Sequence, residues 1–187
     1  DNLDEFLAGV DLYIDSLDFF ALDIRRAVFK ACYERGIPAV TAAPLGMGTA
    51  FLAFLPGKMS FDEYFGLEGQ EPAEQAVRFL VGLAPRALHV GYLADRSRVN
   101  LEAKEGPSTA MAIQLCAGYA CVQAIKLLLG RGEVAPAPWG LQFDAYTGRL
   151  KRTWTSGGYR NPIQALKLAV ARRMLRRSTP AARAQAS

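Results

Sequence analysis

The 187-residue sequence predicts an α/β domain with a mixed sheet, in which parallel strands are followed by antiparallel strands and helices flank the sheet. Residues 10–14 form an apolar segment that is followed by a helical repeat and then by a second apolar segment, residues 39–43. That order is typical of a parallel strand–helix–strand unit with a right-handed crossover. A third apolar segment, residues 49–55, follows so soon that it can pair with the second only in the antiparallel direction.

The helix between the first two strands is predicted from the spacing of its apolar residues. Its core side is expected to carry Ile24, Ala27, Val28, Ala31 and Cys32. Its solvent side is expected to carry Arg25, Arg26, Lys30, Glu34 and Arg35. Gly36 and Pro38 then end the helix.

Five further segments are expected before residue 133. Residues 59–70 contain Phe61, Tyr64 and Phe65 among acidic residues. We interpret this stretch as a loop, either a lid or partner surface or a segment whose aromatic side chains cover the core. The other elements are a helix at residues 72–84, a strand at 87–93, an exposed crossing loop at 94–106 and a long helix at 107–129. Polar residues interrupt the long helix, which is therefore interpreted as a buried core helix rather than a membrane span.

The end of the chain is expected to form a hairpin and a helix. The hairpin strands are residues 140–145 and 149–155, and the helix begins at Pro162 after a capping Asn161. Ile163, Leu166, Val170 and Met174 lie on one face of this helix. We expect three regions: a main part at residues 1–133, a hairpin and basic helix at 134–177, and a tail at 178–187.

The charge is distributed unevenly, although the net charge is only +4. Residues 150–187 contain several Lys and Arg residues and no acidic residue. This basic end fits a solvated helix face, an acidic partner, a membrane surface or a nucleic acid. Because nothing else in the sequence supports a membrane or nucleic-acid partner, neither is expected.

The cysteine pattern indicates reduced thiols. Cys32, Cys116 and Cys121 all lie in helical patterns, and none belongs to a Cys-x-x-Cys pair. The expected location is therefore cytoplasmic, and no zinc site is expected. The one histidine, His89, lies in a strand-like pattern and is interpreted as a core or edge residue rather than a catalytic base.

Two carboxylates stand where the first strand gives way to the first long helix. Asp15 and Asp18 follow the apolar residues of the strand, and Phe19 comes next. Parallel sheets bind ligands at the carboxyl ends of their strands, so this turn is the candidate site. The alternative for Asp18 is an N-cap role, in which its carboxylate accepts hydrogen bonds from the helix N–H groups.

Four segments, in order, resemble the ubiquitin-activating-like ThiF/MoeB adenylyltransferases. They are Asp15-Ser16-Leu17-Asp18-Phe19 (Asp-x-x-Asp-Asn in the family), Arg35-Gly36-Ile37-Pro38-Ala39-Val40, Ala42-Ala43-Pro44-Leu45-Gly46, and Gly106-Pro107-Ser108 leading to Gln123-Ala124-Ile125-Lys126-Leu127-Leu128-Leu129-Gly130. The resemblance covers residues 1–132 and implies a Rossmann-like mixed sheet. Residues 139–175 resemble an extension of some bacterial members.

The resemblance implies an activity. Such enzymes use ATP and Mg²⁺ to convert the C-terminal carboxylate of a ubiquitin-like or sulfur-carrier protein, or of a peptide, into an acyl-adenylate. Asp18 would be the catalytic residue that holds Mg²⁺ or the ATP phosphates, and Phe19, in place of the family's Asn, would offer its backbone N–H at the helix start. Asp15 would order the turn. Family members form homodimers through the later elements, so a homodimer is expected.

The sequence also departs from the family. It contains no Gly-x-Gly-x-x-Gly loop, and residues 93–106 contain no cysteine for thioester transfer. We therefore expect the glycine-rich half of the nucleotide site to precede Asp1. The alternatives are a catalytically inactive dimerisation or scaffold module that keeps the fold, and a nicotinamide or flavin oxidoreductase.

Overall fold

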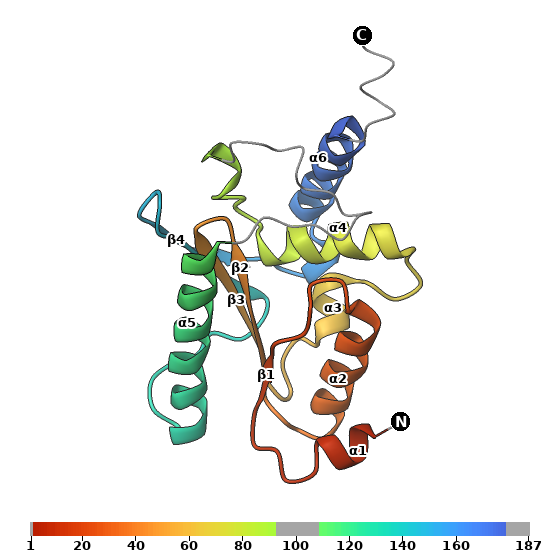
Figure 1. Ribbon diagram of the computed structural model, residues 1–187. Helices are drawn as coiled ribbons and strands as arrows, with labels where there is room; N and C mark the ends of the chain where they lie inside the picture. The colour runs from red at the N-terminus through yellow and green to blue at the C-terminus, as the bar shows by residue number, and fades with distance from the viewer. Residues whose placement is uncertain (1, 93–108, 179–187) are drawn as a thin grey trace.

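The computed structural model describes residues 2–92 and 109–178, with side chains described up to residue 174. Five strands form one sheet in the order β1-β2-β3-β4-β5 (Figure 1). They are β1 (Tyr13–Asp15), β2 (Ala39–Leu45), β3 (Gly48–Phe54), β4 (Trp139–Asp144) and β5 (Arg149–Trp154). β1 and β2 are parallel, and each later pair is antiparallel. The mixed sheet that the sequence predicts is confirmed, and the β4–β5 hairpin continues it.

Helices cover both faces of the sheet (Figure 1). They are α1 (Leu3–Phe6), α2 (Leu22–Glu34), α3 (Phe61–Phe65), α4 (Pro72–Leu83), α5 (Ala110–Leu129) and α6 (Pro162–Ser178), with short 3-10 turns η1 (Val90–Tyr92) and η3 (Gly158–Arg160). α5 packs on β2 and β3 from one side, α2, α3 and α4 lie on the other, and α6 packs on α4.

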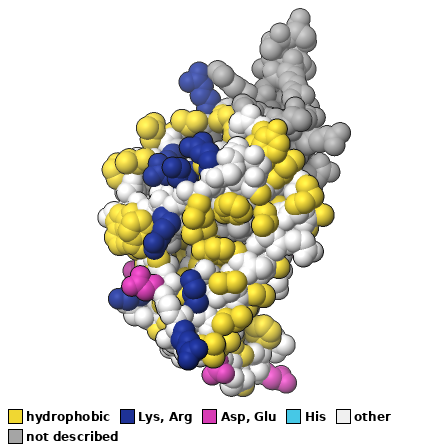
Figure 2. All heavy atoms as spheres, turned by 90° about the vertical axis from the view of Figure 1, so that its left-hand side faces the viewer, with side chains coloured by type: hydrophobic (Ala, Val, Ile, Leu, Met, Phe, Trp, Pro, Cys, Tyr) yellow, Lys and Arg dark blue, Asp and Glu magenta, His cyan; other side chains and the backbone are white. Residues whose placement is uncertain are grey.

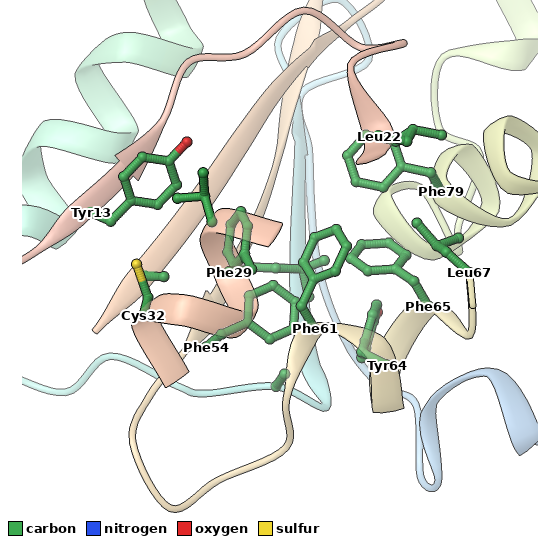
Figure 3. Close-up of a cluster of buried hydrophobic side chains, with 14 of the residues drawn as sticks. Tyr13, Leu22, Phe29, Cys32, Phe54, Phe61, Tyr64, Phe65, Leu67 and Phe79 are labelled. Atoms are coloured by element: carbon green, nitrogen blue, oxygen red, sulfur yellow. The ribbon is translucent and has the colours of Figure 1, made fainter. Parts of the chain in front are cut away.

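The main core is a cluster of aromatic rings between the sheet and α2, α3 and α4 (Figure 3). Phe54 of β3 packs against Phe29 of α2 and against Phe61 and Phe65 of α3. The 59–70 stretch therefore contains a helix, which Ser60 begins with a capping box. Its aromatic residues are buried, so they cover the core and do not form a lid or an exposed partner surface.

Phe65→Ala is expected to lower the free energy of unfolding by about 3–5 kcal/mol, because it leaves a cavity in this cluster. Phe65 is 1% exposed and its ring lies 4.7 Å from that of Phe61 and 4.9 Å from that of Phe79. Urea unfolding followed by circular dichroism measures the change. Ile24→Ala is the control, since Ile24 is 61% exposed. Equal losses for the two variants would contradict the assignment of Phe65 to the core.

Three predicted features around α2 and η1 are wrong. α2 begins at Leu22 and not at Phe19, where the family resemblance placed the helix start, and residues 19–21 belong to the preceding turn. Ile24 and Ala27 are exposed and Arg25 is buried, the reverse of their expected faces. The strand expected at residues 87–93 is absent from its described part, which contains the 3-10 turn η1. The crossing loop expected at residues 94–106 lies outside the described residues.

α5 is buried on one side only, which contradicts its interpretation as a buried core helix. Its buried residues are Ala112, Ala120, Gln123 and Ala124. Its large exposed apolar residues are Met111, Ile113, Val122, Ile125, Leu128 and Leu129. Figure 2 views the α5 side of the molecule and shows apolar side chains over much of it, with Lys and Arg among them. By length and composition α5 is also the one described helix that could cross a membrane.

Candidate functional site: the turn between β1 and α2

Asp15, the last residue of β1, is buried and fully engaged. Its Oδ2 accepts hydrogen bonds from Arg25 Nε at 2.7 Å and from Thr41 Oγ1 of β2 at 2.8 Å. Its Oδ1 accepts the Leu17 N–H at 3.2 Å. Because these donors occupy both oxygens inside the protein, Asp15 fixes the end of β1 and is not open to a ligand.

Arg25 is the residue that holds the turn in shape. Its side chain is 3% exposed and forms a buried ion pair with Asp15. The guanidinium also donates to three backbone carbonyls of the turn: Nη2 to Leu17 O at 2.6 Å and to Asp18 O at 3.0 Å, and Nη1 to Phe19 O at 3.2 Å. A planar fork with several donors suits this task, since the Leu17 and Phe19 carbonyls have no other donor among the described residues.

Sequence reasoning placed Arg25 on the solvent side of α2. The signal that could have found it is its spacing, since the buried residues Leu22, Arg25, Phe29 and Cys32 recur at helical intervals on one face. The guanidinium lies 4.8 Å from the ring centroid of Phe79, so the core packs against its other side as well.

Asp18 is exposed, in contrast to Asp15. Its Oδ1 accepts the Phe20 N–H at 2.9 Å, and its backbone carbonyl accepts the Ala21 N–H at 3.0 Å. The N-cap position of α2 is occupied by Ala21, so the alternative in which Asp18 caps the helix is wrong. Among the described residues, Asp18 Oδ2 accepts no hydrogen bond, and it is the carboxylate oxygen available to a ligand.

Phe19 has a structural position. It is half-buried, and its ring lies 4.9 Å from that of Phe20 and 5.2 Å from that of Phe79. Because α2 begins three residues later, the Phe19 N–H does not lie at the helix start as expected. The side chain anchors the turn to the aromatic core beside the exposed Asp18.

The turn fits a magnesium ion that arrives with a phosphate ligand. Mg²⁺ usually takes one or two protein carboxylates and completes its shell with phosphate oxygens and water. Asp18 offers one such oxygen on a backbone that Arg25 fixes. The described residues contain no group of three or more His, Cys, Asp or Glu side chains that could hold a metal by themselves. The turn therefore suits a metal–nucleotide complex better than a free metal ion.

A second polar cluster, which sequence reasoning missed, joins η1 to the turn between β2 and β3. The Tyr92 hydroxyl donates to Asp144 Oδ2 at 2.5 Å and accepts the Met47 N–H at 2.8 Å. Burial alone would raise the pKa of Asp144, but hydrogen bonds from Tyr92 and Thr147 bring it below its ordinary value. Thr109 Oγ1 donates to the Gly46 carbonyl at 3.1 Å. Both ends of the segment between residues 92 and 109 are therefore attached at Gly46–Met47.

His89 lies close to the same turn. A side chain added at Gly46 would meet the His89 Cβ at 2.7 Å. Burial lowers the pKa of His89, although the nearby Asp144 opposes the shift. The shift favours the neutral imidazole. Within the described residues it has neither the cysteine nor the serine partner that a catalytic base would activate.

Comparisons with known proteins agree with the geometry. The sequence model of the ThiF family matches residues 1–162, which extends the resemblance beyond Gly132 into the hairpin. No curated protein sequence matches the chain. Similar folds occur in Escherichia coli MccB solved with ATP, at 12% identity and a TM-score of 0.54 over 87% of this chain. They also occur in the microcin C7 biosynthetic enzyme MccB solved with N-formylated MccA, at 13% identity and a TM-score of 0.53 over 88%.

The chain covers only part of those proteins. It spans 42% of the MccB chain solved with ATP and 44% of the one solved with N-formylated MccA. At these identities the similarity to MccB is a similarity of fold. The family assignment depends instead on the sequence match, which covers most of the chain. The chain belongs to the ThiF family.

Proposed function

We propose that this chain is part of an ATP-dependent adenylyltransferase. Its substrate would be the C-terminal carboxylate of a ubiquitin-like or sulfur-carrier protein, or of a peptide, and its product an acyl-adenylate. The observation that carries the proposal is the exposed Asp18, held at the carboxyl end of β1 by the buried Arg25, in a chain of the ThiF family. MccB, which has a similar fold, has been solved with ATP and with MccA.

The reaction joins two anions, the substrate carboxylate and ATP, so their negative charge must be neutralised in part by the site. A carboxylate oxygen of the substrate attacks the α-phosphorus of ATP, a new O–P bond forms, and the bond to pyrophosphate breaks. Mg²⁺ bound with the nucleotide would neutralise part of the phosphate charge. Asp18 would hold that ion in place through its free carboxylate oxygen, and Arg25 would keep Asp18 in position through the backbone. Residues 93–106 contain no cysteine, so the acyl group would not be transferred from the adenylate to a thiol of that segment.

Other parts of the nucleotide site would come from outside these residues, since the sequence has no glycine-rich phosphate loop. We further propose a cytoplasmic location, in line with the free cysteines Cys32, Cys116 and Cys121. The alternative function, a catalytically inactive dimerisation or scaffold module, would need α5 and the hairpin but not Asp18.

Exchange of labelled pyrophosphate into ATP decides between the two functions. The experiment uses the full-length protein that carries this chain, with candidate carriers or peptides that have a free C-terminal carboxylate. Exchange that requires the substrate, and that stops when its C-terminus is amidated, supports adenylation. If no carrier or peptide supports exchange while the protein still forms its oligomer, the scaffold function is correct.

A homodimer that covers the exposed side of α5 is part of this proposal. Ile125→Glu is expected to raise the dimer dissociation constant about tenfold or more, because it places an unpaired charge among buried apolar groups. Ile125 is 56% exposed, and Val122, Leu128 and Leu129 lie around it. Sedimentation velocity measures the change. Ala27→Glu, on the exposed side of α2, adds the same charge on the other face of the sheet and is expected to leave the dimer intact. Equal weakening by both variants would place the interface elsewhere.

A further inference from the structure

α6 is fixed to the body of the protein by one side. Asn161 caps it, and its side-chain oxygen accepts hydrogen bonds from the N–H groups of Ile163 and Gln164. Gln164 Nε2 donates to the Val81 carbonyl of α4 at 3.2 Å, and Leu168 is 5% exposed. One turn later Arg172 Nε donates to Glu74 of α4 at 2.9 Å. These contacts recur along the helix, so they set which of its sides faces outward.

The outward side of α6 carries an apolar stripe. Ile163 is 63% exposed, Leu166 66% and Val170 51%, and Met174 continues the same spacing. At 100° per residue these positions fall within roughly a quarter of the helix circumference. We call these residues the α6 stripe. The single face on which the sequence places them is turned away from the protein's own core.

Cations border the stripe on both sides. By helix geometry Lys167 lies next to Ile163 and Val170 on one border, and Arg173 lies next to Leu166 and Val170 on the other. The sequence from residue 145 onward contains no acidic residue that could balance them. A narrow apolar seam between charged borders is the pattern by which one helix packs against another.

The same pattern argues against two other occupants. A second copy of α6 would bring Lys167 and Arg173 against equal charges, which is unfavourable at a helix seam. A membrane surface favours a wider apolar face, whereas here Lys167 and Arg173 border the large apolar side chains, and the side with Gln164 and Arg172 packs on α4.

We infer that the α6 stripe binds an amphipathic helix of another protein whose apolar seam is bordered by Asp and Glu. Its apolar residues would pack on Ile163, Leu166 and Val170. Its carboxylates would pair with Lys167 and Arg173, which sets partner choice and the rate of association. This site is independent of the proposed adenylation, because α6 lies on α4 while Asp18 lies at the turn before α2 (Figure 1).

Fluorescence anisotropy tests the inference with a designed probe. The probe is a labelled helical peptide of about three heptads, with Leu at the core positions and Glu at the flanking positions. A matched peptide carries Lys at the flanking positions. The protein is compared with Leu166→Glu, with Val170→Glu and with Ala165→Glu, a control that adds the same charge to α6 at an exposed position off the stripe. Circular dichroism confirms that each variant is folded.

The Glu peptide is expected to bind with an affinity that falls as salt is added, and the Lys peptide is expected not to bind. Both stripe variants are expected to lose about tenfold or more of the affinity for the Glu peptide, and the control is expected to keep it. Failure of the Glu peptide to bind would overturn the inference, as would equal binding by the stripe variants. Two further results would overturn it in favour of another occupant. One is stripe-dependent sedimentation with phosphatidylserine vesicles, and the other is self-association that Leu166→Glu abolishes.

Discussion

Asp18→Asn in the full-length protein is expected to reduce substrate-dependent ATP–pyrophosphate exchange by about a hundredfold or more, since metal-assisted charge stabilisation is worth several kcal/mol. Asn keeps the oxygen that accepts the Phe20 N–H, so the turn should survive the change. What it removes is the negative charge on the oxygen that no described residue contacts. The free energy of unfolding should therefore stay within about 0.5 kcal/mol of the unaltered protein.

The control for this variant is Asp11→Asn, which changes an exposed carboxylate before the amino end of β1, at the opposite end of the strand. Exchange is measured over a range of Mg²⁺ concentrations. If Asp18 holds the ion, the variant should need more Mg²⁺ than the unaltered protein to reach half of its own maximal rate. Full exchange by Asp18→Asn, or an equal loss in the control, would remove Asp18 from the site.

The sheet could be predicted because its determinants are local. Only Gly46 and Met47 separate β2 from β3, and a connection that short permits antiparallel pairing alone. The turn residues around Gly148 likewise indicate the β4–β5 hairpin in the sequence. Asp18 could be placed after the end of the first strand for the same reason, since the carboxyl end of a strand can be located without knowing what packs around it.

Features that depend on tertiary contacts were missed. Arg25 was assigned to solvent by its charge, because its carbonyl partners belong to a turn whose shape no periodicity encodes. The side of α5 that is exposed could not be predicted, because α5 is apolar nearly all round. Which face of α6 is exposed depends on its contacts with Glu74 and Val81 of α4, which are far away in the sequence.

Arg25→Ala is expected to lower the free energy of unfolding by about 3–5 kcal/mol, the usual cost of removing one partner from a buried ion pair. Asp15 is 7% exposed and would lose its closest partner of opposite charge. The carbonyls of Leu17 and Phe19 would lose their donor at the same time, and the Asp18 carbonyl would keep only the Ala21 N–H. Chemical denaturation measures the loss. Arg26→Ala is the matched control, since the Arg26–Asp62 ion pair is partly exposed and should contribute about 1 kcal/mol or less.

The double variant Arg25→Met with Asp15→Leu separates stability from positioning. With both charges removed and similar volumes retained, most of the lost stability should return. Exchange activity should not return with it, because Met cannot donate hydrogen bonds to the backbone around Asp18. A double variant that is as stable and as active as the unaltered protein would show that Arg25 serves only to neutralise Asp15. A stable but inactive one assigns the positioning of Asp18 to the polar contacts of the Asp15–Arg25 pair.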